Sequence, residues 1–112
     1  MDIVEARQNG VVAIGAIGRL DSNTAKAFEE KVIGAIEADK PRMVIDLAGL
    51  DYISSAGLRV LLMAAKRIKA AQGNLILCGL QPHVREVFDV SGFSTIFSIQ
   101  PDRAAAATAI GS

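Results

Sequence analysis

Apolar runs separated by turn signals predict five strands, over residues 1–8, 11–17, 42–47, 75–78 and 93–99. Residues 42–47 and 75–78 are almost wholly apolar, as is typical of parallel strands that are covered on both faces. Asn9-Gly10 predicts a tight hairpin between the first two strands. Ser94-Thr95 interrupts the last strand near its start.

Apolar residues at helical spacing predict four helices, over about residues 22–39, 55–71, 82–91 and 102–110. Asp21 or Ser22 is expected to cap the first helix, and Pro41 to follow its end near Asp39-Lys40. The second helix follows a Ser-Ser pair, which is a capping signal. Its buried face is predicted by Leu58, Leu61, Leu62, Ala65 and Ile68.

Strands that alternate with helices predict one α/β domain over residues 1–112, with a mixed, mostly parallel sheet and an antiparallel N-terminal edge strand. Right-handed crossovers bring the loops after parallel strands to one end of the sheet. Asp21, residues 48–57 and Gly79 are therefore expected at that end, where open α/β sheets place their sites.

The composition of the chain excludes several classes of function. The 12 basic and 12 acidic residues cancel, so the chain has no basic footprint for nucleic acid. No apolar run approaches the length of a membrane span. A single Cys78 excludes an intramolecular disulfide, which with no secretion signal favours a reducing, cytoplasmic compartment. One His and one Cys are too few for a structural zinc site.

Two serines at the start of the second helix are the main candidates for chemistry. Backbone N–H groups point outward there and the helix dipole is positive, so a phosphate suits the position. Ser55 is the expected phosphoacceptor, because small Ala56 and Gly57 leave its hydroxyl uncovered. Ser54 is the alternative acceptor, and either hydroxyl can serve simply as the helix cap.

Other polar residues admit more than one role. Asp21 can cap a helix, contact a partner or take part in phosphate transfer, and Arg59 and Met63 are expected on the outer face of the second helix. A Ser-His-Asp hydrolase would depend on His83, but no G-x-S-x-G elbow is present. Cys78 is expected in the core.

The stretch Tyr52-Ile53-Ser54-Ser55-Ala56-Gly57-Leu58-Arg59-Val60-Leu61-Leu62 resembles the signature of the STAS domain, and more narrowly that of bacterial anti-sigma factor antagonists. The likeness extends over the whole chain. Gly18-Arg19-Leu20-Asp21 with Thr24 resembles the family's G-x-L-D-x-x-T segment, and Phe88 with Gly92 resembles its F-x-x-x-G helix. The chain departs from the best-known members at Ser54, where they have Asp, and at Arg59, where they have Gly.

The resemblance implies a binding protein without catalytic residues or a cofactor. The unphosphorylated form would bind an anti-sigma factor that is also a serine kinase, and sigma factor would be released. The kinase would phosphorylate Ser55, and a PP2C-type phosphatase would reverse this. The implied partner-binding residues are Asp21, Ser54, Ser55, Ala56, Gly57, Leu58, Arg59 and Met63. The alternative is a STAS-like sensor or scaffold that binds a small ligand or nucleotide, or that regulates a target other than a sigma factor.

Overall fold

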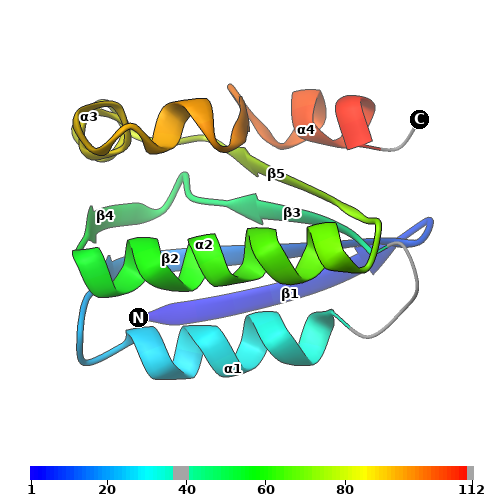
Figure 1. Cartoon of the computed structure of the whole chain (residues 1–112), viewed down its shortest axis with the longest axis horizontal. Helices are drawn as coiled ribbons and strands as arrows, with labels where there is room; N and C mark the ends of the chain where they lie inside the picture. The colour runs from blue at the N-terminus through cyan, green and yellow to red at the C-terminus, as the bar shows by residue number, and fades with distance from the viewer. Residues whose placement is uncertain (37–40, 111–112) are drawn as a thin grey trace.

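The computed structural model describes residues 1–36 and 41–110, and within these ranges it contains a six-stranded sheet and four α-helices (Figure 1). In chain order the elements are β1 (Asp2–Gln8), β2 (Val11–Leu20), α1 (Ala25–Ala35), β3 (Arg42–Asp46), β4 (Leu50–Ile53), α2 (Ser55–Ala70), β5 (Asn74–Cys78), α3 (Pro82–Ser91), the 3-10 helix η1 (Phe93–Thr95), β6 (Ser98–Gln100) and α4 (Arg103–Ile110).

The sheet has the strand order β1-β2-β3-β5-β6, and β4 pairs separately with the end of β2. β1 is antiparallel to β2 and forms one edge, whereas β2, β3, β5 and β6 are parallel. Asn9 and Gly10 both have positive φ, 54° and 78°, as a two-residue hairpin turn requires. The predicted α/β class, mixed sheet and antiparallel edge strand are therefore confirmed.

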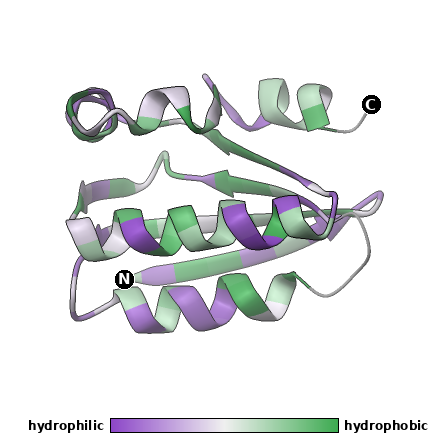
Figure 2. Ribbon diagram, in the orientation of Figure 1, coloured by the Kyte–Doolittle hydropathy of each residue, from purple (hydrophilic) through white to green (hydrophobic). Residues whose placement is uncertain are grey.

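Helices cover both faces of the central strand β3. Met43 and Ile45 join the large core cluster beneath α1 and α2, and Val44 points the other way, into a smaller cluster with Ala106 and Ile110 of α4. Figure 2 shows the hydrophobic stretches of β3 and β5 between these helix layers. This arrangement confirms the prediction of a strand buried on both faces, although β3 ends at Asp46 and does not include Leu47. No α-helix among the described residues is both long and apolar enough to cross a bilayer.

One strand was not predicted from the sequence. Residues 50–53 were expected in a loop, but they form β4, which pairs in parallel with Gly18, Arg19 and Leu20. Strand β2 consequently extends to Leu20 rather than ending at Ile17. A four-residue strand has no periodicity that can be recognised in the sequence, and only its pairing with β2 identifies it.

The strand expected over residues 93–99 is also wrong for residues 93–97, and only residues 98 and 99 of it belong to a strand. Gly92 ends α3 with a φ of 79°, and Phe93–Thr95 then form η1 before the short strand β6. Aromatic packing favours this turn, because the Phe97 ring lies 5.9 Å from that of Phe88 and 6.1 Å from that of Phe93. The end of the first helix expected near Asp39-Lys40 lies outside the described residues, and α1 is helical to Ala35.

Candidate functional site

Two chain segments meet at the carboxyl ends of β2 and β4. Leu20 and Ile53 are paired in the sheet, and the backbone N–H of Ser54 donates to the carbonyl of Leu20 at 2.9 Å. Asp21 and Ser54 directly follow these paired residues, so they leave the sheet side by side. The expectation that the Asp21 turn and the serine loop share one end of the sheet is confirmed.

Ser54 is the N-cap of α2. Its backbone is extended (φ −97°, ψ 174°), and its hydroxyl accepts a hydrogen bond from the Gly57 N–H at 3.4 Å. The side chain is half-buried. The predicted capping role is therefore confirmed for Ser54, and its hydroxyl already has an intramolecular partner.

Ser55 is the first residue of α2 and is exposed. Within residues 1–36 and 41–110, no hydrogen bond engages its side chain. The first turn of α2 contains no acidic residue, so the positive end of the helix dipole is not neutralised within the helix. An exposed hydroxyl at such a position can accept a phosphoryl group whose charge the helix terminus tolerates.

Gly57 allows the start of α2 to approach the strand ends closely. A Cβ atom at this position would lie 2.7 Å from Cγ of Leu20 and 3.0 Å from Cγ1 of Ile53, which are both core residues. Real Cβ atoms essentially never come as close to another heavy atom as the 2.7 Å to Leu20. The absence of a side chain at Gly57 therefore determines how α2 lies on β2 and β4, and so where Ser55 lies.

The remaining residues of the implied binding set divide into buried and exposed groups. Gly57 and Leu58 lie on the buried face of α2, and Ala56 and Met63 are half-buried against the core. Arg59 is exposed and lies four residues after Ser55, on the same side of the helix. Exposed contact atoms therefore come chiefly from Ser55 and Arg59, with a partial contribution from Met63.

The turn before α1 differs from the expectation. Asp21 and Ser22 do not cap the helix: Thr24 holds the N-cap position without a side-chain capping bond. The Asp21 carboxylate instead accepts the Asn23 N–H at 2.9 Å, and the Thr24 hydroxyl accepts the Asp21 N–H at 2.9 Å. The prediction failed because the 21–24 segment forms a closed turn of its own before the helix begins. This turn holds the half-buried carboxylate of Asp21 in place.

Arg19 and Tyr52 form an exposed pair that was not predicted from the sequence. They are opposite each other on β2 and β4, and the Arg19 guanidinium lies 4.2 Å from the centre of the Tyr52 ring. Tyr52 is 41% exposed, and Nε of Arg19 lies 3.8 Å from the Asp21 carboxylate. The pair follows from the β2–β4 pairing, so no signal in the sequence could have found it.

His83 and Cys78 have structural positions. Nε2–H of His83 donates to the Asp51 carbonyl at 2.5 Å, and no hydrogen bond joins His83 to a serine in the described part of the chain. Cys78 lies in the core, as expected, where burial first and the Asp46 carboxylate second raise the pKa of its thiol to about 11. Across residues 1–36 and 41–110, no three His, Cys, Asp or Glu side chains gather in a way that could hold a metal ion.

Comparison with known proteins identifies the family and supports the fold. The family model of the STAS domain matches residues 2–106. The chain belongs to the STAS domain family. This STAS chain is 43% identical over 109 residues to a Bordetella bronchiseptica protein named as an anti-sigma factor antagonist, BtrV, in a match that covers 97% of this chain and 94% of that protein.

Solved STAS structures have the same fold. The anti-sigma factor antagonist from Mycobacterium paratuberculosis is 27% identical with a TM-score of 0.87, and the match covers 99% of this chain and 94% of the other. The phosphorylated form of the Bacillus cell fate determinant SpoIIAA is 21% identical with a TM-score of 0.70, over 93% of this chain and 96% of the other. At that identity the likeness to SpoIIAA concerns the fold alone.

Proposed function

We propose that this STAS protein is an anti-sigma factor antagonist that is switched by phosphorylation of Ser55. The unphosphorylated form binds an anti-sigma factor with serine kinase activity in the cytosol and thereby releases sigma factor. The kinase phosphorylates Ser55, and a PP2C-type phosphatase restores the binding form. The protein itself is a non-catalytic binding module formed by one domain. The observation that carries the proposal is the exposed Ser55 hydroxyl at the start of α2, next to the capping Ser54.

The geometry supports Ser55 over Ser54 as the acceptor. Phosphorylation of Ser54 would remove the hydroxyl that accepts the Gly57 N–H, whereas Ser55 has no such role. The turn of Asp21 lies beside the same strand ends, and Arg59 follows Ser55 by four residues. A cation at the start of a helix opposes the dipole, so Arg59 is better explained by an acidic group of the partner or by the phosphate itself.

A local charge is sufficient to operate this switch. A phosphoserine adds roughly −1.5 to −2 charges at neutral pH. Burying that charge without a partner in a protein interface costs several kcal/mol. Binding weakens a hundredfold for a loss of only ~2.8 kcal/mol, so no rearrangement of the fold is required.

The surface that meets the partner extends beyond the serines. Tyr52 and Arg19 are held against each other at the exposed ends of β2 and β4. Tyr and Arg are frequent binding hot spots, and Tyr buries a large area at a low cost in side-chain entropy. We include both residues in the proposed contact surface with Asp21, Ser55, Arg59 and Met63.

The test begins in the host. Phosphosite mapping of growing and stressed cells should find phosphate on Ser55 that falls under stress and disappears in Ser55→Ala. The kinase purified by this activity should then bind wild-type protein and Ser55→Ala equally, and Ser55→Asp at least tenfold more weakly. Thr108→Asp, which adds the same charge on the exposed side of α4, is the matched control and should bind normally. Equal affinity of Ser55→Asp and Ser55→Ala would refute the switch, and phosphate on Ser54 would refute the choice of acceptor.

A further inference from the structure

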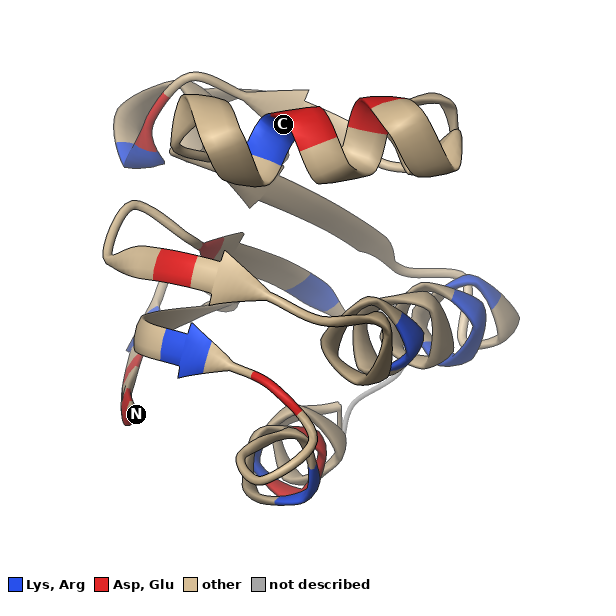
Figure 3. Ribbon diagram, turned by 90° about the vertical axis from the view of Figure 1, so that its left-hand side faces the viewer, with Lys and Arg blue, Asp and Glu red and all other residues tan. Residues whose placement is uncertain are grey.

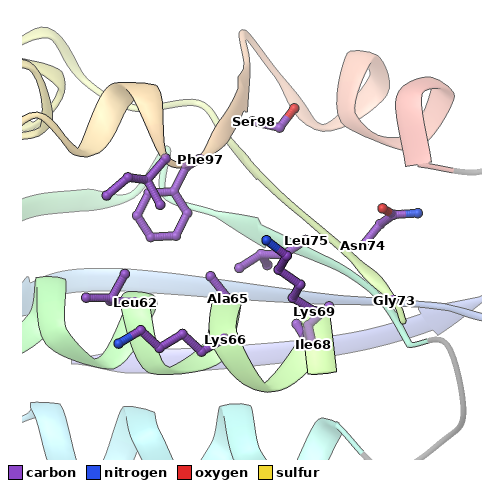
Figure 4. Close-up of a pocket in the computed structure, with 11 residues that line it drawn as sticks. Leu62, Ala65, Lys66, Ile68, Lys69, Gly73, Asn74, Leu75, Phe97 and Ser98 are labelled. Atoms are coloured by element: carbon purple, nitrogen blue, oxygen red, sulfur yellow. The ribbon is translucent and has the colours of Figure 1, made fainter. Parts of the chain in front are cut away.

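An open groove of about 450 Å³ lies along the outer side of α2, between that helix and residues 96–98 (Figure 4). Its floor is apolar and is formed by Leu62, Ala65, Leu75 and Phe97. In Figure 4 the Phe97 ring points across the groove toward α2. Ile96 lies at the margin of the groove, with 54% of its surface exposed.

The groove exists because the helix layer ends before the sheet does. Helices α1 and α2 lie side by side on one face, and α2 contacts β5. β6 continues the sheet beyond β5 and forms its edge. Among the described elements, α1 is the one helix that contacts α2 extensively, and α3 and η1 reach this layer only beside Phe97, through Phe88 and Phe93. A third helix placed alongside α2, at the usual 8–10 Å between axes, would therefore complete the layer.

The rim of the groove is cationic. Lys66 and Lys69 are exposed on α2 and line the groove, and no acidic residue lines it among those that the structure describes. The whole of α2 contains four basic residues and no acidic one, although the charges of the chain balance. Figure 3 shows this helix with blue positions only. The helix dipole accounts for cations near a helix end, but not for an apolar floor and an exposed Ile96 beside them.

We infer that this groove binds an acidic amphipathic helix of a partner protein, at a site separate from the Ser55 switch. The groove is open along one side and would enclose a small molecule poorly. A helix instead matches its shape, because Leu62, Lys66 and Lys69 follow one another at i, i+4 and i+7 over ~10 Å of α2. The partner helix places apolar residues at the same spacing on the floor and acidic residues against the two lysines.

The phosphorylated residue lies far along α2 from the outer lysine of the groove. Ser55 and Lys69 are fourteen residues apart on one helix, which corresponds to ~21 Å along its axis. A surface charge at Ser55 is largely screened over that distance. The groove therefore accepts its helix in both phosphorylation states of Ser55.

The test uses two synthetic peptides of sixteen residues. The probe has Leu at i, i+4 and i+7 flanked by Glu, and its control has Lys in place of every Glu. Titration of the ¹⁵N-labelled protein should move amide resonances of residues 62–69, 73–75 and 96–98 with the acidic peptide only. Ser55→Asp should leave the affinity within twofold of wild type, so the outcome does not depend on the proposed switch.

Variants at the lysines and at Ile96 test which side chains of the groove contact the peptide. The double variant Lys66→Glu/Lys69→Glu should bind the probe at least tenfold more weakly, whereas Arg67→Glu, exposed on the same helix but outside the groove, should change affinity by less than twofold. Ile96→Ser should weaken binding at least threefold, and Val90→Ser, 82% exposed elsewhere, should not.

Four results would overturn the inference. They are equal binding of the two peptides, equal effects of the lysine and Arg67 variants, the same resonance shifts with dodecanoate alone, and concentration-dependent shifts at these residues without any peptide. The third would indicate a site for small amphiphiles, and the fourth an interface between two copies of this chain.

Discussion

Replacement of Gly57 by Ala adds one methyl group at the point where α2 meets the ends of β2 and β4. The new Cβ would lie 2.7 and 2.9 Å from two carbons of the Leu20 side chain and 3.0 Å from Cγ1 of Ile53. Leu20 is fully buried and Ile53 is 4% exposed, so neither side chain can move aside into solvent. Either the helix start shifts outward or the core side chains leave their rotamers.

Two opposing terms determine the net effect. Overpacking a close-packed core costs typically ~1–3 kcal/mol. Ala instead of Gly in a helix favours folding by up to ~1 kcal/mol. We therefore expect Gly57→Ala to lower the free energy of unfolding by about 1–2 kcal/mol. That is a substantial part of the roughly 5–15 kcal/mol that stabilises a domain of ordinary size.

Gly34 is the matched control, because it is an exposed residue of α1 where an added Cβ would have no heavy atom within 4 Å. Gly34→Ala should raise the free energy of unfolding by about 0.5–1 kcal/mol. The same chemical change is thus expected to have opposite signs at two helical positions. Urea unfolding followed by far-UV circular dichroism measures both, as midpoint shifts of about 0.5–1 M downward for Gly57→Ala and less than that upward for Gly34→Ala.

The packing argument would be refuted if Gly57→Ala were as stable as wild type or more stable. A double-mutant cycle provides a second check on the contact. If the added methyl group presses on Leu20, then Leu20→Ala should cost less in the Gly57→Ala background than in wild type. Additive effects would show that the strain, if present, does not involve Leu20.

Further predictions concern a pair of caps and the buried thiol. Asp102→Ala should lower the free energy of unfolding by ~1 kcal/mol, because the Asp102 carboxylate accepts the Ala105 N–H at 2.8 Å. Ser54→Ala should lower it by less, because the capping bond of Ser54 is 3.4 Å long. Equal losses of the two variants in urea unfolding would contradict this comparison. Burial raises the pKa of the Cys78 thiol from 9.0 to about 11, so between these values the unfolded chain loses the thiol proton while the folded chain keeps it. Wild type should therefore lose about 2–3 kcal/mol of stability relative to Cys78→Ala as the pH rises through this window, and parallel pH profiles of the two proteins would disprove it.

Local patterns in the sequence were sufficient to predict most of the fold. The apolar run before Asp46 needed cover on both faces, and the structure places α1 and α2 on one side and α4 on the other. Asn9-Gly10 specified its hairpin through backbone chemistry alone. The errors fell on short elements such as β4 and η1, where three or four residues provide no period and long-range pairing or aromatic packing decides the conformation.

The site was predicted in part. The position of Ser54 as N-cap and of Ser55 at the helix start followed from the residues around them. Asp21 was placed at the correct end of the sheet but given the wrong local role, since its carboxylate closes a turn rather than capping α1. Arg19 and Tyr52 became neighbours only because β4 joins β2, which local sequence does not reveal.

By itself, the sequence determined the α/β class, the capped start of α2 and the small residues that leave Ser55 uncovered, because these features depend on contacts within a few residues. Only the tertiary structure decided which distant residues lie beside Ser55, how closely α2 approaches Leu20, and that a groove remains beside Lys66 and Lys69. Those outcomes depend on strand pairing and on where the helix layer ends. Both are set by the packing of the whole chain rather than by any one segment of it.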